Sequence, residues 1–292
     1  MVSVSFHKLA VFGVGLIGGS FALALKQAGV VDKVVGLGRS HGNLARALEL
    51  GVIDETAAEP QAALQGADLV LVAVPVRQMS SIFAAIAPHL EPGVAITDGG
   101  STKRDVIEAA RAGLGSKFGC FVPAHPIAGA ELSGVDAASG DLYRGRTVVI
   151  TPSAQTEPRA RTRVDAAWLA CGARVVEMAA QRHDEVLGAV SHLPHVLAFA
   201  LVDMIAQRAD AKELLSFSGA GFRDFTRIAS SSPEMWRDIC IANRDMLLAG
   251  LQAYQGELAA LAKLLEAGDG QGLERTFTSA RVARNAWLAE RK

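Results

Sequence analysis

The stretch from Leu9 to Gln27 constrains the fold of this chain more than any other part of its sequence. It reads LAVFGVGLIGGSFALALKQ: a short apolar run, glycines spaced G-x-G-x-x-G, and then a helical segment. A short apolar run bounded by glycine is typical of a buried parallel strand. A strand, a glycine-rich turn and a helix in this order predict a dinucleotide-binding unit of the Rossmann type.

Each glycine of this motif has a separate physical task. Gly13 makes the tight turn, Gly15 lets the backbone approach a pyrophosphate, and Gly18 lets the helix pack closely on the strand. The N–H groups at the helix start attract that anion. The predicted cofactor contacts in this turn and after a later strand are Gly13, Gly15, Leu16, Ile17, Gly18 and Val74.

Apolar runs typical of strands recur at the intervals of βα units. After the first strand they occupy residues 33–38, 67–75, 93–100, 120–126, 146–151 and 173–178. Helical segments separate the early runs, and this alternation predicts an α/β fold with a doubly wound, mainly parallel sheet. The strand pattern then stops, and 292 residues are too many for most single cores. We expect a dinucleotide-binding domain at residues 1–178 and a helical domain at residues 179–292.

Composition excludes several classes of protein. Half of the residues are apolar and 20% are charged, which is typical of a folded chain. The formal net charge of −1 provides no basic field for nucleic acid or anionic lipid. The three cysteines are far apart and form no CxxC pair, and the N-terminus shows no export signal. We therefore expect a cytoplasmic protein with free thiols, no nucleic-acid partner and no zinc bound through sulfur.

The end of the second predicted strand bears on the choice of cofactor. A carboxylate about 20 positions after the glycines is typical of sites that prefer NAD. This chain has Arg39 and Ser40 there, in GLGRSHGN. Arg39 can pair with a 2′-phosphate and stack on adenine, and Ser40 can donate a hydrogen bond. Arg39 could instead be a solvated loop residue. We predict NADP as the cofactor, with NAD as the alternative.

Two later loops follow predicted strands at the edge where substrate is expected. Ser101, in TDGGSTKRDV, lies at a helix start, where a serine could also serve only as an N-cap. His125 ends the next strand, between Pro123 and Pro126, which hold the backbone extended. A histidine beside a nicotinamide is suited to acid–base chemistry near neutral pH, so we predict a catalytic role for His125.

Residues 191–206 are almost wholly apolar, and they lie within residues 183–207, which predict one long helix with a possible kink at Pro194. A membrane span, a metal site and a buried helix could each look like this. His192, His195 and Asp203 interrupt the apolar run, and no charged flanking pattern supports membrane insertion. The two histidines lack an HExxH glutamate and an obvious third ligand for zinc. We expect no membrane and no metal, but a helix buried in a core or between subunits.

Five segments together resemble the prephenate/arogenate dehydrogenase family of tyrosine biosynthesis. They are VFGVGLIGGS, TDGGSTK, HPIAGAELSG, SHLPHVLAFAL and GAGFRDFTRIASSSPEMWRDI. The resemblance implies oxidative decarboxylation of a small cyclohexadienol. A hydride leaves ring C4 for the nicotinamide, the 4-hydroxyl loses its proton, and CO₂ departs as the ring becomes aromatic. It also implies an all-helical second domain through which two chains form a homodimer.

The resemblance implies a role for individual residues as well. His125 matches the histidine that takes the proton of the 4-hydroxyl, and Ser101 matches the serine that hydrogen-bonds that histidine and the nicotinamide side of the site. On the substrate side, His195 matches a histidine of the pocket, and Arg227 matches the arginine that binds a substrate carboxylate.

Two further substrate-side residues follow from the same resemblance. Trp236 matches a tryptophan near the side chain of the substrate, and Glu131 matches an acidic residue that gates the pocket. Ala130 stands where the family often has a hydroxyl side chain. The choice between prephenate and arogenate, and any feedback by tyrosine, therefore stay open.

Two other classes of protein share part of this pattern. A β-hydroxyacid dehydrogenase or imine reductase would have the same first half and a helical second domain, but HPIAG, SHLPH and DFTR would be unexplained. A non-catalytic NADP-sensing module would bind the cofactor without turnover, and the set of Ser101, His125 and Arg227 argues against it.

Overall fold

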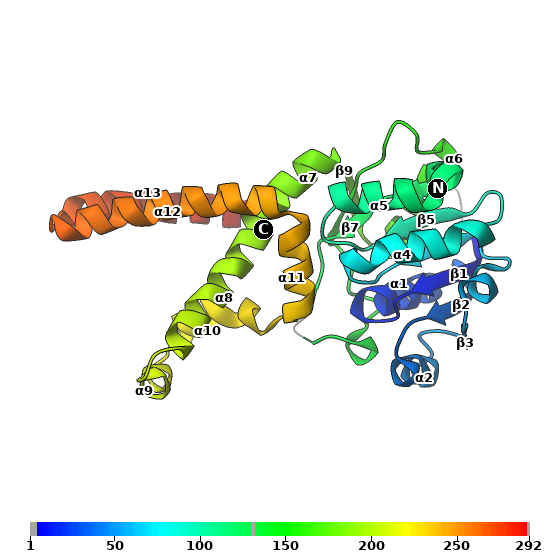
Figure 1. Ribbon diagram of the computed structural model, residues 1–292, viewed down its shortest axis with the longest axis horizontal. Coiled ribbons are helices and arrows are strands. Elements are labelled where there is room, and N and C mark those ends of the chain that lie inside the picture. The colour runs from blue at the N-terminus through cyan, green and yellow to red at the C-terminus, as the bar shows by residue number, and fades with distance from the viewer. Residues whose placement is uncertain (1–4, 130–131, 291–292) are drawn as a thin grey trace. The chain divides into compact units, whose positions relative to one another are not determined.

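The computed structural model describes residues 5–129 and 132–290 of the chain (Figure 1). The chain divides into two compact units, residues 1–244 and residues 245–292. The second unit is formed by the helices α12 (Arg244–Glu266) and α13 (Gly270–Ala289). The boundary expected at residue 178 marks where the strand pattern ends, whereas these two units are defined by their compactness. The expected boundary stays a prediction.

A six-stranded parallel sheet, with the strand order β3-β2-β1-β4-β5-β6, organises the first unit. Its strands are β1 (Phe6–Phe12), β2 (Val31–Leu37), β3 (Glu55–Thr56), β4 (Leu69–Val72), β5 (Ala95–Asp98) and β6 (Phe121–Val122). The direction in which successive strands are added reverses between β1 and β4. Dinucleotides bind at such a switch point, outside the carboxyl ends of the strands. The expected doubly wound α/β fold is confirmed.

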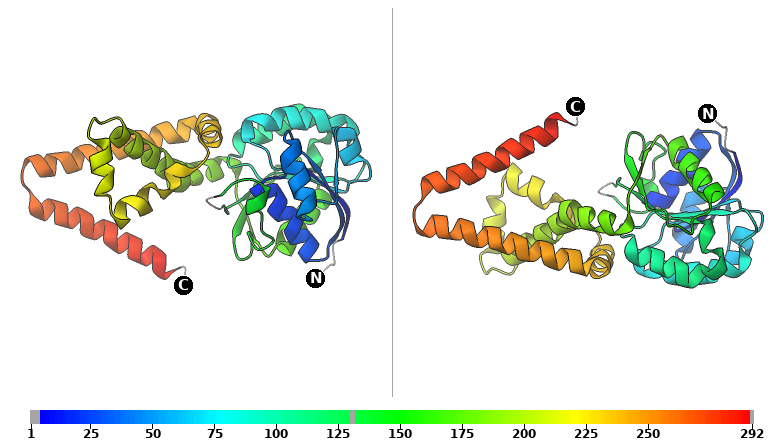
Figure 2. Two further views of the ribbon diagram at one scale, coloured as in Figure 1. Left: turned by 90° about the horizontal axis from the view of Figure 1, so that it is seen from below. Right: turned by 90° about the horizontal axis from the view of Figure 1, so that it is seen from above.

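Helices cover both faces of this sheet, as Figure 2 shows for the blue α1 on one side and the cyan α4 on the other. The strand β1 shows why both faces are covered. Leu9 and Val11 belong to one hydrophobic cluster, and Ala10 and Phe12 belong to a second. Side chains alternate along a strand, so an unbroken apolar run buries both faces. The helices around the sheet are α1 (Leu16–Gln27), α2 (His41–Glu49), α3 (Pro60–Leu64), α4 (Val76–Ile86), α5 (Arg104–Leu114) and α6 (Pro158–Ala170).

The end of the predicted strand 120–126 and the last two predicted strands form a separate sheet. It consists of β7 (Ala124–Pro126), β8 (Thr147–Ile150) and β9 (Arg174–Glu177), with β7 antiparallel to β8 and β9 parallel to it. The sequence predicted a mainly parallel sheet but gave no sign that these strands form a sheet of their own. The run 120–126 breaks at Pro123, which has no N–H to offer a sheet. Beyond it, the chain leaves β5 and pairs with β8.

Within residues 179–290, only helices and their connections are present. In the first unit they are α7 (Ala180–Leu187), the π-helical turn η4 (Gly188–His192), α8 (Leu193–Ala206), α9 (Ala211–Ser216), α10 (Ala220–Thr226), the 3-10 turn η5 (Arg227–Ser230) and α11 (Pro233–Ala242). Further 3-10 turns, earlier in the chain, are η1 (Ala87–His89), η2 (Gly115–Cys120) and η3 (Val135–Ala137).

The long apolar stretch is one continuous helical segment, Ala180–Ala206. The irregularity expected at Pro194 is the π turn before it, because proline has no N–H for the ordinary helical hydrogen bond. In the described part of the chain, this helix is long enough and apolar enough to cross a membrane. Length and composition alone are weak evidence for a membrane span. Only 11% of its most apolar window is buried, and Val190 and Met204 are 69% and 60% exposed. The single chain therefore does not bury this helix in its own core.

Candidate active site

The glycine turn lies at the switch point between β1 and β4. Gly13 has a φ of 99°, and a Cβ there would overlap the carbonyl of Ala73. A Cβ at Gly18 would overlap the carbonyl of Gly13, whereas a Cβ at Gly15 would meet nothing within 4 Å. The turn thus needs Gly13 and Gly18 for its own geometry, and it leaves open space at Gly15. These are the tasks that the motif predicts for the three positions.

The start of α1 is suited to an anion. Its N-cap, Gly15, has no side chain to bond the first N–H groups, and its first turn contains no acidic residue. Leu16 and Ile17 open the helix, and the Ile17 carbonyl accepts a hydrogen bond of 2.6 Å from the hydroxyl of Tyr143. Val74 follows β4 and packs beside Gly13. The structure therefore brings together the cofactor contacts predicted for this turn.

Arg39 and Ser40 lie in the connection between β2 and α2, and both are exposed. Ser40 is the N-cap of α2, where its hydroxyl oxygen accepts a hydrogen bond from the N–H of Asn43. The Asn43 side chain donates to the carbonyl of Val14 at 2.6 Å. This bond ties the Arg39 loop to the glycine turn. In the described part of the chain, Arg39 forms no ion pair with a carboxylate.

Ser101 lies in the connection from β5 to α5, and the structure decides against its alternative role as an N-cap. The helix α5 begins at Arg104, and its N-cap is Lys103. The predicted contact of Ser101 with His125 is not present as a hydrogen bond among the described residues. The backbone of Ser101 instead contacts the buried ring of His192.

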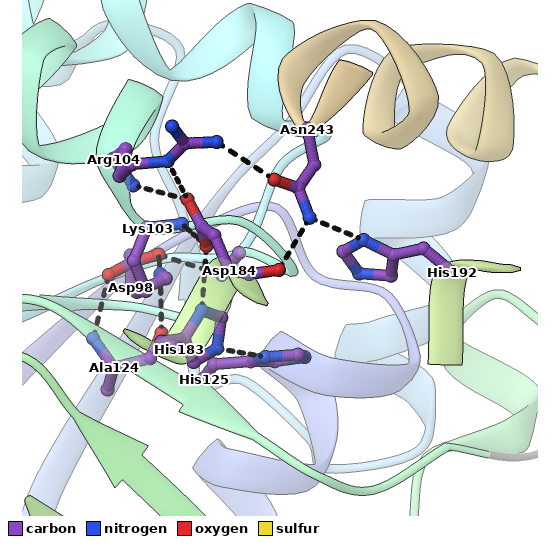
Figure 3. Close-up of polar contacts among 10 residues, drawn as sticks. Asp98, Lys103, Arg104, Ala124, His125, His183, Asp184, His192 and Asn243 are labelled. Carbon is purple, nitrogen blue, oxygen red and sulfur yellow. Dashed lines mark hydrogen bonds and ion pairs between the residues drawn. The ribbon is translucent and has the colours of Figure 1, made fainter. Parts of the chain in front are cut away.

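His125 belongs to a chain of hydrogen bonds that runs into α7 (Figure 3). Its Nδ1 lies 2.8 Å from Nε2 of His183, and Nδ1 of His183 lies 2.8 Å from Oδ1 of Asp184. Burial lowers the pKa of His125 well below the usual histidine range, and the nearby rings and the charge of Lys103 lower it further. His125 is therefore neutral at pH 7 and can accept a proton.

A buried ion pair holds the backbone directly before His125. Lys103 and Asp98 have fully buried side chains, and the Lys103 ammonium donates to the Asp98 carboxylate. Lys103 also donates to the carbonyl of Ala124 at 2.8 Å, and Asp98 accepts the Ala124 N–H at 2.9 Å. Both backbone polar groups of Ala124 are thus bonded to the pair. These bonds fix the backbone at the residue before His125.

Asp184 joins α7 to the start of α5. Its two oxygens accept the backbone N–H groups of Lys103 and Arg104, at 2.9 and 3.0 Å, and the Arg104 Nε at 3.0 Å. Burial raises the pKa of Asp184, but the hydrogen bonds from His183 and from these N–H groups outweigh it and lower the pKa below its usual value. Asp184 is therefore an ionised carboxylate whose lone pairs are all in use.

Asn243 extends this network to the end of α11. Its amide nitrogen donates to the carbonyl of Asp184 at 2.8 Å and to Nδ1 of His192 at 3.1 Å. Its amide oxygen accepts from Arg104 at 3.0 Å. Burial lowers the pKa of His192 to about 4, so this ring is neutral.

The predicted substrate-side residues of the helices form a second group. The ring of His195 stacks on Trp236 with centroids 3.7 Å apart, and its Nδ1 donates to the carbonyl of Ser191 at 2.9 Å. Burial lowers the pKa of His195, and the charge of Arg227 acts in the same direction. The structure thus brings His195, Trp236 and Arg227 together. Glu131 and Ala130 lie outside the described residues.

Several polar residues of the site were not predicted from the sequence. They are Asp98, Lys103, His183, Asp184 and Asn243. Asp98 and Lys103 had a usable signal, because charged residues at both ends of a glycine loop after a buried strand invite pairing. His183 and Asp184 had none, since the same letters at the start of a solvated helix would read identically. Among the described residues, no group of three or more His, Cys, Asp or Glu side chains could hold a metal, and all three cysteines are free.

The glycine turn at the switch point and the neutral histidine beyond the ends of β5 and β6 define the class of protein, which is a nicotinamide-dependent dehydrogenase. Two family models match this chain. One is described as prephenate dehydrogenase, nucleotide-binding domain, and matches residues 21–177, and the other as prephenate dehydrogenase, dimerization domain, and matches residues 179–279. The chain belongs to the prephenate dehydrogenase family.

Individual relatives agree with this assignment. Cyclohexadienyl dehydrogenase of Zymomonas mobilis is 38% identical over 286 residues, 96% of this chain and 96% of that protein. The crystal structure of prephenate dehydrogenase from A. aeolicus with hydroxyphenyl propionate and NAD⁺ has a TM-score of 0.90 and 34% identity, and covers 97% of this chain and 98% of that one. The crystal structure of Synechocystis arogenate dehydrogenase has a TM-score of 0.79 and 27% identity, over 96% and 99%. The protein is an NAD(P)-dependent oxidoreductase of this family.

Proposed function

We propose that the enzyme oxidatively decarboxylates prephenate, arogenate or both, and releases 4-hydroxyphenylpyruvate or tyrosine. The names of its relatives support this reaction, since they are prephenate, cyclohexadienyl and arogenate dehydrogenases. The observation on which the proposal depends is the position of His125, and its lowered pKa agrees with it. His125 is a neutral imidazole beyond the carboxyl ends of β5 and β6, where a parallel sheet binds its ligands.

His125 is the general base of this mechanism. A neutral histidine accepts the proton of the substrate 4-hydroxyl, and a base positioned in this way contributes roughly 10²- to 10⁴-fold in rate. A bound nicotinamide would supply the acceptor for the hydride that leaves ring C4. Ser101, half-buried after β5, hydrogen-bonds on the nicotinamide side of the site. Loss of CO₂ and aromatisation supply the driving force, so the protein mainly orients the reacting groups.

Arg227 and His195 bind the anionic end of the substrate. Prephenate carries two carboxylates, and a planar guanidinium can bond a carboxylate through two N–H groups. Nδ1 of His195 is engaged by the Ser191 carbonyl, and this leaves its Nε2 to face the substrate. Trp236 holds the His195 ring by stacking. Glu131 is the proposed gate of the pocket, on the strength of the resemblance alone.

NADP is the cofactor that we propose for this chain, with NAD as the alternative. The residues present fit a dinucleotide: open space at Gly15, uncapped N–H groups at the start of α1, and Leu16, Ile17 and Val74 around the turn. The 2′-phosphate is assigned to Arg39 and Ser40, because both are exposed in a loop bonded to the glycine turn.

We further propose a cytoplasmic homodimer that forms through the helical domain, residues 179–292. Large apolar side chains on Ala180–Ala206 are exposed in the single chain, as expected of a helix that a partner covers. The family model that matches residues 179–279 is described as a dimerization domain.

A direct test is a spectrophotometric assay in which prephenate and arogenate are each combined with NADP⁺ and NAD⁺. We expect turnover of at least one substrate, with the lower cofactor KM for NADP⁺. His125→Asn should lower kcat by about 10²-fold or more and hardly change the affinity for NADP⁺. Near-normal turnover in this variant would remove His125 from the mechanism.

A further inference from the structure

We infer that His183 and Asp184 are positioning residues that hold His125 in one tautomer, with the proton on Nδ1 and the lone pair of Nε2 free for the substrate. The inference deepens the proposed function, since it rests on His125 as the base. It comes from the direction in which hydrogen bonds must run through these three side chains (Figure 3).

Asp184 determines which nitrogen donates in each hydrogen bond of this chain. An ionised carboxylate can only accept hydrogen bonds, and the hydrogen bonds to Asp184 keep its pKa below the usual value. Nδ1 of His183, 2.8 Å from Oδ1 of Asp184, must therefore carry a proton and donate it.

The protonation of His183 in turn determines which atom donates in its hydrogen bond with His125. Burial lowers the pKa of His183 in spite of the neighbouring carboxylate, so the ring is neutral and carries one proton. That proton is on Nδ1, and Nε2 of His183 is therefore an acceptor. Nδ1 of His125, 2.8 Å away, must donate to it.

Only one nitrogen of His125 then remains for chemistry. With Nδ1 protonated and the ring neutral, Nε2 holds a lone pair, which is what a general base needs. During the reaction the 4-hydroxyl proton binds Nε2, and the proton on Nδ1 stays hydrogen-bonded to His183. The positive charge that forms is stabilised through His183 by the charge of Asp184. The opposite tautomer would present an N–H to the hydroxyl and could not take its proton.

Asp184 is itself held in place by α5. Its oxygens accept the N–H groups of Lys103 and Arg104 in addition to that of His183. In an Asp184→Asn variant the amide oxygen would take the position of Oδ2, where two Arg104 N–H groups need an acceptor, and the NH₂ would take the position of Oδ1, facing His183 and the single N–H of Lys103. That NH₂ would force Nδ1 of His183 to accept. The protons of both histidines would then be reversed, and Nε2 of His125 would be protonated.

The wild-type protein provides the first test. We expect ¹⁵N NMR spectra of histidine-labelled protein, assigned with His125→Asn, to show His125 neutral with Nδ1 protonated. The opposite tautomer would overturn the inference, whatever the activity. This measurement needs no variant of the relay to fold. It is also separate from the proposed function, which fails if neither substrate turns over.

Kinetics of variants provide the second test. His183→Leu removes the acceptor, and we expect kcat to fall by about 10²-fold with little change in the substrate KM or in the NADP⁺ affinity. His183→Gln keeps an acceptor and a donor, and should recover part of that loss. Asp184→Asn should lower kcat at neutral pH at least as much. The matched control is His7→Leu, because the His7 side chain is 77% exposed. Wild-type kcat and pH profile in a folded His183→Leu variant would overturn the inference.

Discussion

Replacement of Lys103 by methionine should destabilise the protein strongly, because this side chain is half of a fully buried ion pair. Methionine has a similar length but no charge. It would leave the Asp98 carboxylate without its cation and the Ala124 carbonyl without its donor. Breaking a buried pair from one side typically costs about 3–5 kcal/mol. At about 2–4 °C per kcal/mol, the Tm should fall by roughly 6–20 °C.

The second half of the experiment removes both charges. In Asp98→Asn/Lys103→Met no uncompensated charge is left, and replacing a whole buried pair is often close to neutral. We therefore expect the double variant to be more stable than Lys103→Met alone, which is a coupling that a double-mutant cycle measures directly.

Differential scanning fluorimetry of the purified variants gives the comparison. Lys33→Met is the matched control, since Lys33 pairs with Glu55 at the surface, where side-chain exposures are 40% and 58%. An exposed pair contributes about 0–1 kcal/mol, and this control should have a Tm near that of the wild type. The reasoning is refuted if Lys103→Met melts within about 3 °C of the wild type, or if the double variant is no more stable than it.

Three other predictions concern binding and pH. Arg39→Ala should raise the KM for NADP⁺ about tenfold or more and leave that for NAD⁺ nearly unchanged, as a lost charge-assisted contact to a 2′-phosphate requires; an equal effect on both cofactors in steady-state kinetics would contradict it. Arg227→Ala should chiefly raise the substrate KM, and an unchanged KM would move the carboxylate site elsewhere. Burial lowers the pKa of His192 to about 4, so the unfolded state binds more protons between pH 6.5 and 4. Stability should therefore be fully present above pH 6.5 and fall as the pH drops toward 4. Denaturation midpoints that do not change across this window would refute the assignment of His192 as a buried neutral ring.

Much of the nucleotide-binding part could be predicted from the sequence because its signals are local. The glycines at 13, 15 and 18 lie between an apolar run and a helical segment, which is typical of a tight strand-to-helix turn, and the structure shows the expected overlap at Gly13 and Gly18. Apolar runs identified the strands because their signal is also local. Successive side chains of a strand point to opposite faces, so an unbroken apolar run indicates a strand that is buried on both faces. His125 stood out because prolines on both sides keep its backbone extended.

What a buried polar side chain bonds to could not be predicted in this way. His125 and His183 are 58 positions apart, and nothing in either local pattern shows that α7 brings one imidazole against the other. The same holds for Asn243, which reaches Asp184 from the end of α11. It also holds for β7, whose partner is β8 rather than β5. Periodicity and turn chemistry depend on neighbours along the chain. The sequence therefore determined the elements of this enzyme and the place of His125, whereas the tertiary structure alone decided which groups meet the His125 ring.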